Sequence, residues 1–203
     1  MLEIILKGGV FVYILFIFSI IGLAFFIERF LFIKNSKNKS KDFLPAIREL
    51  YKKEGVKAAY RYCSLHPSVI SNIFKVGLRN SSKNPTEIRA IIDSVGDLEI
   101  RKLEKNLGIL ATLGSVSPLV GFLGTVTGMI KAFMEIERLG GNVNASVLAG
   151  GIWEALITTA VGLSIGVLMY IGYNFLVIWV EGYILEVEEN SVELLDILHK
   201  VDE

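Results

Sequence analysis

Residues 106–130, NLGILATLGSVSPLVGFLGTVTGMI, form a stretch of 25 residues without a charged side chain. About 20 apolar residues are enough to cross the hydrocarbon core of a bilayer as a helix. Two further stretches meet this test, because residues 8–27 carry no charge and residues 139–180 carry only Glu154. The sequence therefore predicts an all-α membrane protein with three transmembrane helices.

The composition of the 203-residue chain agrees with a membrane protein. It is 52% hydrophobic and 21% charged with a net charge of zero, and its mean hydropathy is +0.54. These values argue against an intrinsically disordered chain, a disulfide-stabilised domain and a basic nucleic-acid-binding protein. The single cysteine, Cys63, has no metal-ligand spacing around it and is expected to be a free thiol that is either buried or otherwise ordinary.

The charges are segregated along the chain. Residues 29–110 carry 17 Lys and Arg against 8 Asp and Glu, whereas residues 181–203 carry one Lys against eight acids. The positive-inside rule places the basic segment in the cytoplasm, the N-terminus and the segment near 131–150 outside, and the C-terminus inside. The acidic tail and the basic segment then share a compartment. They either pair, within or between subunits, or remain solvated.

Helical patterning continues beyond the spans. Residues 34–42 are polar and expected to be solvated, and apolar stripes predict helices within 43–60 and over about 67–79. Residues 84–87, NPTE, are typical of a helix start. Because no breaker follows, we expect one helix from about residue 85 to beyond 130. Residues 180–201 should continue the third span as a helix.

The chain accordingly divides into six parts. The expected division is an N-terminal segment with transmembrane helix 1 (1–33), a cytoplasmic helical domain (34–105), transmembrane helix 2 (106–131), a short periplasmic loop (132–150), transmembrane helix 3 (151–180) and a cytoplasmic C-terminal helix (181–203).

Small residues recur at helical spacing along the second and third spans. They let helix backbones approach closely in lipid, where apolar side chains do not drive helices together. The two seams predict that spans 2 and 3 pack against each other or against copies of themselves. The seam of span 2 is Gly114, Ser117, Gly121, Gly124 and Gly128, and that of span 3 is Ala155, Thr159, Gly162 and Gly166.

The polar residues of these spans are the candidate site. A carboxylate within a span costs about 2.5–3.5 kcal/mol on insertion scales, so Glu154 is expected to face a cavity or a partner. Thr158 lies one turn further on, and antiparallel spans would bring Thr125 and Thr159 to a similar depth. This pattern suggests an ion pathway that needs a second protonatable group from elsewhere. Alternatively, the hydroxyls bond their own helices and Glu154 caps the start of span 3.

Two long motifs resemble the ExbB, TolQ and MotA proton-channel family. They are SPLVGFLGTVTGMI at residues 117–130 and GIWEALITTAVGL at residues 151–163, followed by Tyr173-Asn174. Glu28-Arg29 at the end of span 1 is also similar to the family. The GTVTGMI form looks ExbB-like, since TolQ-like sequences tend to carry Trp where Thr127 stands. Family members often have a proline in span 3, but residues 165–170 contain none.

The resemblance implies a homopentamer with spans 2 and 3 around a central pore. It also implies an ExbD-like single-span partner that supplies an intramembrane aspartate, and a TonB-like protein that uses the work for outer-membrane import. In the family's pattern Thr125 and Thr159 line the pore and Glu154 is its carboxylate, whereas Thr158 matches a position that is less often polar. The implied location is the bacterial inner membrane, with no cofactor and no metal.

Two other functions stay open at this point. One is a TolQ-like or other stator subunit of an envelope complex, and the other is a membrane scaffold that oligomerises through its glycine seams and conducts nothing. An enzyme is not expected, because His66 and His199 have no nucleophile or metal ligands around them. A nucleic-acid partner is not expected either.

Overall fold

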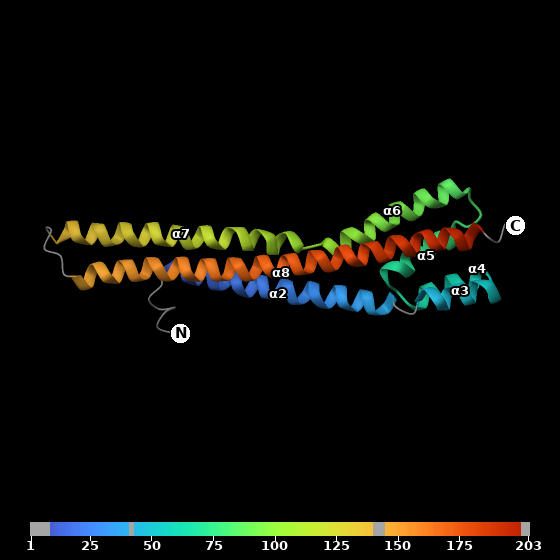
Figure 1. Ribbon diagram of the computed structural model, residues 1–203, viewed down its shortest axis with the longest axis horizontal. Helices are drawn as coiled ribbons and strands as arrows, with labels where there is room; N and C mark the ends of the chain where they lie inside the picture. The colour runs from blue at the N-terminus through green and yellow to red at the C-terminus, as the bar shows by residue number, and fades with distance from the viewer. Residues whose placement is uncertain (1–8, 41–42, 140–144, 200–203) are drawn as a thin grey trace. The chain divides into compact units, whose positions relative to one another are not determined.

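The computed structural model describes residues 9–40, 43–139 and 145–199, and its regular structure is entirely helical (Figure 1). Three stretches of it are long and apolar enough to cross a membrane, at Gly9–Lys37, Pro85–Arg138 and Leu148–Leu195. The predicted all-α fold with three candidate spans is confirmed. The helices are α2 (Gly9–Ser40), α3 (Phe43–Glu54), α4 (Val56–Leu65), α5 (Val69–Arg79), α6 (Pro85–Glu104), α7 (Leu107–Arg138) and α8 (Ala145–His199).

The chain forms two compact units. The first, called the apolar unit here, comprises residues 1–28 and 106–175, and the second, the polar unit, comprises residues 29–105 and 176–203. Both α2 and α8 run from one unit into the other as continuous helices. The extension of span 3 is therefore confirmed to His199, while residues 200 and 201 lie outside the described residues.

In the apolar unit, α7 and α8 pack antiparallel and α2 runs parallel to α8. Gly114 lies against Gly166, and Gly128 lies against Ala155. Residue numbers therefore increase along α7 as they decrease along α8, which makes the two helices antiparallel. Gly22 of α2 lies against Met169 of α8. Large apolar side chains of α2 stay exposed, as expected of a lipid-facing helix; they include Phe16, Ile17, Ile20 and Leu23.

In the polar unit, α5 packs against both α4 and α6. The rings of Phe43 and Phe74 meet edge to face with centroids 5.6 Å apart. The Ser71 hydroxyl donates to the Cys63 carbonyl at 2.8 Å. Cys63 is buried, as one of the sequence-based alternatives had it, and burial raises the pKa of its thiol to about 12.

The prediction of one unbroken helix from residue 85 to beyond 130 is wrong. The helix ends at Glu104 and α7 begins at Leu107, because Asn106 adopts a left-handed backbone with φ of 66°. Asparagine tolerates this conformation better than most residues. The buried Arg29 donates to the Lys102 carbonyl at 3.0 Å, which satisfies a carbonyl in the last turn of α6.

The polar segment 34–42 is helical as far as α2 extends, to Ser40. It was expected to be solvated, and Lys34 and Asn35 are exposed. Tertiary contacts explain the helix, because the Tyr183 hydroxyl donates to the Ser36 carbonyl at 3.1 Å and Ile33 is fully buried. The stripe over 43–60 is split at Gly55, whose φ of 78° separates α3 from α4.

The segment 132–150, expected as a loop, is mostly helical. It lies in α7 up to Arg138 and in α8 from Ala145 onward. Packing extends the helices here, since a side chain on Gly151 would meet Ala132 at 2.6 Å. Residues 140–144 lie outside the described residues.

The basic segment and the acidic tail meet within a single chain. The Lys37 ammonium lies 3.7 Å from the Glu186 carboxylate, and Arg48 forms an ion pair with Glu193. Of the alternatives left open by the sequence, pairing within one subunit is therefore the one observed in the polar unit.

Candidate functional site

The two seams of small residues face each other across α7 and α8. A Cβ added to Gly162 would lie 2.7 Å from the Ser117 carbonyl oxygen and 2.8 Å from the Gly121 Cα. A Cβ on Gly124 would lie 2.6 Å from the Thr158 hydroxyl. Backbones this close have no room for side chains, which explains why small residues recur at this spacing. The seam residues are Gly114, Ser117, Gly121, Gly124 and Gly128 on α7, and Ala155, Gly162 and Gly166 on α8.

Thr125 and Thr159 meet across this seam. Their hydroxyls contact each other, and the Thr159 hydroxyl also lies 3.0 Å from the Gly121 carbonyl of α7. Thr125 in turn lies 3.3 Å from the Ala155 carbonyl of α8. Both side chains are half-buried. Two hydroxyls from different spans thus form a small polar cluster within otherwise apolar helix surfaces.

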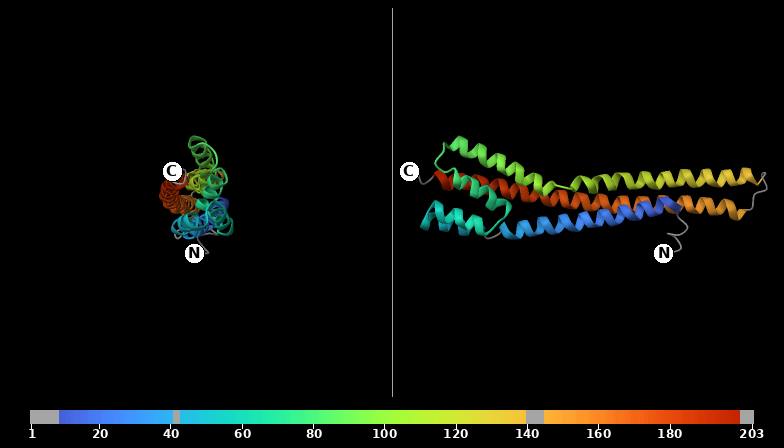
Figure 2. Two further views of the ribbon diagram at one scale, coloured as in Figure 1. Left: turned by 90° about the vertical axis from the view of Figure 1, so that its right-hand side faces the viewer. Right: turned by 180° about the vertical axis from the view of Figure 1, so that it is seen from behind.

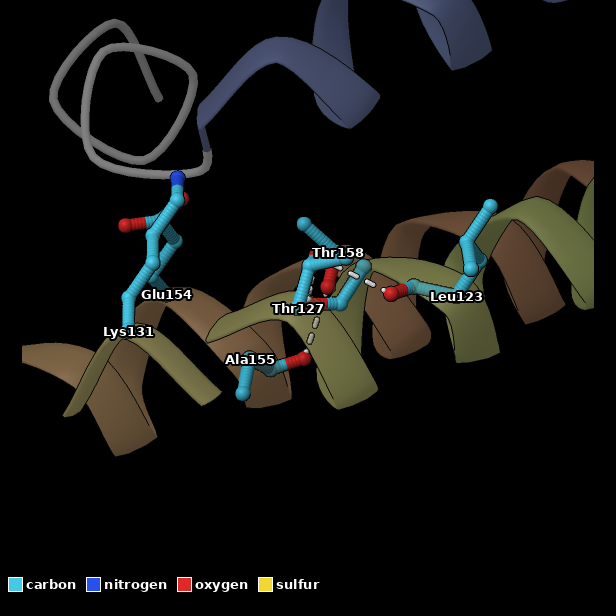
Figure 3. A network of polar contacts seen from close by, with 7 residues as sticks. Leu123, Thr127, Lys131, Glu154, Ala155 and Thr158 are labelled. Atoms are coloured by element: carbon cyan, nitrogen blue, oxygen red, sulfur yellow. Dashed lines mark hydrogen bonds and ion pairs between the residues drawn. The ribbon is translucent and has the colours of Figure 1, made fainter. Parts of the chain in front are cut away.

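Thr158 and Thr127 hydrogen-bond within their own helices (Figure 3). The fully buried Thr158 donates to the Ala155 carbonyl at 2.8 Å, and Thr127 donates to the Leu123 carbonyl at 3.0 Å. The self-bonding alternative therefore describes these two threonines, whereas the Thr125–Thr159 pair also bonds between helices. Thr158 fills the space opposite Gly124 and serves packing.

Glu154 has a partner that the sequence analysis did not assign. Its carboxylate lies 3.4 Å from the Lys131 ammonium of α7, and the two side chains are 27% and 64% exposed (Figure 3). On its other side it lies against Gly9 at the start of α2, where a Cβ would come within 3.0 Å of the Glu154 carboxyl carbon. The signal was available, because antiparallel pairing of Gly128 with Ala155 brings residue 131 close to the preceding turn of α8.

Glu154 and the threonine pair lie on different faces of α8. At about 100° per residue, Thr159 is rotated about 140° from Glu154, whereas Gly172 is five full turns away and shares its face. Gly172 packs against Phe26 of α2. Glu154 therefore lies on the side of α8 that α2 covers. It thus lies apart from the contact between Thr125 and Thr159.

The threonine pair lies on the side of α8 that carries an open groove. A cavity of about 420 Å³ is lined by Gly114 and Pro118 of α7 and by Leu163, Val167 and Tyr170 of α8. Leu163 and Val167 follow Thr159 at intervals of four residues and share its face. A proline thus stands in span 2, where it packs against Gly166, and none stands in span 3.

The site can exchange protons or bind a polar group, but it offers little else. Hydroxyls donate and accept hydrogen bonds, and a carboxylate accepts or carries a proton. Within the ranges that the structure describes, no three His, Cys, Asp or Glu side chains gather in a way that would hold a metal ion.

Comparison with known proteins identifies a family and relatives that this chain resembles. Residues 66–189 match the family described as the MotA/TolQ/ExbB proton channel family. A biopolymer transport protein ExbB homolog of Methanothermobacter thermautotrophicus is 28% identical over 86% of this chain and 62% of its own length. This chain therefore spans less than two thirds of that relative. The Tol-Pal system protein TolQ of Haemophilus influenzae is 30% identical over 98% of this chain and 93% of its own length.

Proposed function

This chain belongs to the MotA/TolQ/ExbB proton channel family, and from that premise we propose that it is the channel subunit of an ExbB–ExbD–TonB-like motor. In this role it sits in the bacterial inner membrane and converts the proton gradient into mechanical work for outer-membrane import. Its N-terminus is periplasmic and its C-terminus is cytoplasmic, in keeping with the basic residues of 29–110.

The observation that carries the proposal is the contact between Thr125 and Thr159. Two hydroxyls bonded between spans provide a polar position within the membrane where a protonatable group can bind. We propose that a homopentamer places this face around a central pore, lined by α7 and α8.

An aspartate supplies the proton carrier in this proposal. An ExbD-like partner contributes it on a single-span helix that inserts into the pore and approaches Thr125 and Thr159. Glu154, on the α2 side of α8 and paired with Lys131, acts as a separate carboxylate of the proton pathway. Thr158 keeps the helices in register.

One charge crossing 100 mV releases about 2.3 kcal/mol, which is enough to bias a conformational step.

A TolQ-like subunit of an envelope complex is the second candidate. It is favoured by the match to the Haemophilus influenzae protein over 98% of this chain. The threonine at position 127 favours the ExbB-like role instead. The partner that copurifies with the chain, ExbD–TonB-like or Tol-like, separates the two.

The test compares proton flux through variants that still assemble. We expect Thr159→Ala, reconstituted with its partner in liposomes under an imposed membrane potential, to lose about tenfold in flux, the equivalent of about 1.4 kcal/mol from a lost hydrogen bond. Thr159→Ser should retain most of it because the hydroxyl remains. Flux is read with a pH-sensitive dye, and assembly is read by native mass spectrometry.

Thr127→Ala is the matched control, because Thr127 bonds only carbonyls of its own helix. It should leave flux unchanged. If the wild type and its partner assemble but carry no proton flux, the channel is rejected and the scaffold alternative is favoured. If the wild type conducts and Thr159→Ala and Glu154→Gln both assemble and conduct equally well, the proposed pathway through these residues is rejected.

A further inference from the structure

An apolar groove runs between α6 and α8 on the outside of the polar unit. It has a volume of about 370 Å³, and the buried side chains of Ile92 and Val187 line its inner side. Val192 also lines it and is 58% exposed. An exposed apolar surface rimmed by polar residues is typical of a docking surface.

The rim of this groove is acidic. Asp93 and Asp97 lie one turn apart on α6, and Glu188 lies opposite them on α8, with Arg89 as the cation among the lining residues. In the part of the chain that the structure describes, neither Asp93, Asp97 nor Glu188 takes part in an ion pair. The groove therefore favours a partner that presents both cations and an apolar side chain.

The same unit carries a ridge with the complementary pattern. Lys57, Arg61 and Leu65 follow at intervals of four residues along α4, all three are exposed, and Leu65 is 67% exposed. Neither Lys57 nor Arg61 makes an ion pair with a described residue. The one-turn spacing of the two cations equals that of Asp93 and Asp97, so one helix can pair both at once.

Groove and ridge lie on opposite sides of the polar unit. Helix α5 packs between α4 and α6, so that α6 is on one side of it and α3 and α4 are on the other (Figures 1 and 2). Two different, complementary patches on opposite sides are what a head-to-tail contact requires, and such contacts form a ring where the rotation between neighbouring subunits closes.

We propose that the groove between α6 and α8 receives the α4 ridge of a second copy of this chain. Asp93 pairs with Lys57 and Asp97 with Arg61 of the neighbouring copy, and its Leu65 covers the apolar floor near Val187. This inference rests on the oligomer proposed above. It adds the surface by which neighbouring subunits recognise each other outside the membrane.

Cysteine cross-linking tests the contact directly. Full-length Asp97→Cys and Arg61→Cys chains with different tags are co-expressed, purified together and treated with a short bis-maleimide. We expect a cross-linked dimer that contains both tags. Neither variant expressed alone should give one. The wild type should give none either, because its Cys63 is buried.

Two controls establish that the charges determine the contact. Replacing Arg61→Cys by Arg101→Cys, an exposed position on α6 itself, should abolish the dimer. Adding Asp93→Lys to the Asp97→Cys chain should lower the yield several-fold, and adding Lys57→Glu to its partner should restore it.

The outcomes separate this inference from the proposed function. An oligomer seen by native mass spectrometry without the mixed dimer overturns the inference and leaves the channel proposal standing, whereas a monomer overturns both. A dimer of Asp97→Cys alone, or an adduct with a copurified single-span partner, assigns the groove to a different contact and also overturns the inference.

Discussion

Glu154 lies close to Thr159 in the sequence but on a different face of α8. The carboxylate pairs with the Lys131 ammonium and lies on the face of α8 that α2 covers. Its distance along the helix from Thr159 is short, but the rotation of about 140° separates them. Depth in the membrane is therefore a weaker guide to a shared site than helical phase.

Cys63 gives a prediction at the same scale. Burial raises the pKa of its thiol to about 12 from an ordinary value of 9.0, so at pH 8 the reactive thiolate is about a thousandfold scarcer than in a free cysteine. We expect labelling by a thiol reagent to be correspondingly slow in the folded protein. The labelling rate is measured by quenching the reaction at a series of times and analysing each sample by mass spectrometry.

The exposed neighbour Ser64→Cys is the control and should label rapidly. Because the raised pKa favours the neutral thiol in the folded state, the associated stability is present below pH 9 and is lost as pH rises toward 12. Rapid labelling of Cys63 without unfolding would contradict its burial.

The contact between α7 and α8 is tested by two glycines on the same helix. Gly162→Ala places a Cβ against backbone atoms of Ser117 and Gly121, and such overpacking costs about 1–3 kcal/mol. Gly182→Ala meets nothing within 4 Å and should stabilise α8 by about 0.5–1 kcal/mol. Thermal unfolding of the detergent-solubilised chain should therefore shift in opposite directions, and equal shifts would argue against a close seam.

The break between α6 and α7 depends on the backbone of Asn106. Asn106→Val should destabilise the fold by about 1–2 kcal/mol, because a β-branched residue is poorly tolerated at a φ of 66°. Asn106→Gly should be close to neutral, since glycine adopts this conformation freely. The two variants are compared by thermal unfolding. A valine variant as stable as the glycine variant would show that the helix runs straight through this position.

For the whole molecule, the proposed orientation makes a prediction about access. A membrane-impermeant maleimide added to intact spheroplasts should label Glu137→Cys, at the outer end of α7. It should label Lys83→Cys, in the polar unit, only after permeabilisation, because the basic segment is expected in the cytoplasm. The reverse pattern would invert the topology and with it the direction of proton flow.

Much of this architecture was predictable from the sequence. The three uncharged stretches predicted the spans, since a bilayer accepts little else. The small-residue seams predicted close packing of spans 2 and 3, and residues of the two seams, such as Gly121 and Gly162, do meet. The break at Asn106 escaped prediction, because asparagine is compatible with both a helix and a left-handed turn.

The sequence by itself determined which three stretches are apolar and long enough to span a membrane as helices, because hydrophobicity and helical periodicity are local properties of the chain. Only the tertiary structure decided which polar groups meet. It joined Thr125 to Thr159, gave Glu154 to Lys131, and brought Arg48 of the basic segment to Glu193 of the tail. These pairings depend on how two helices are rotated against each other, and that rotation is set by packing between residues far apart in the chain.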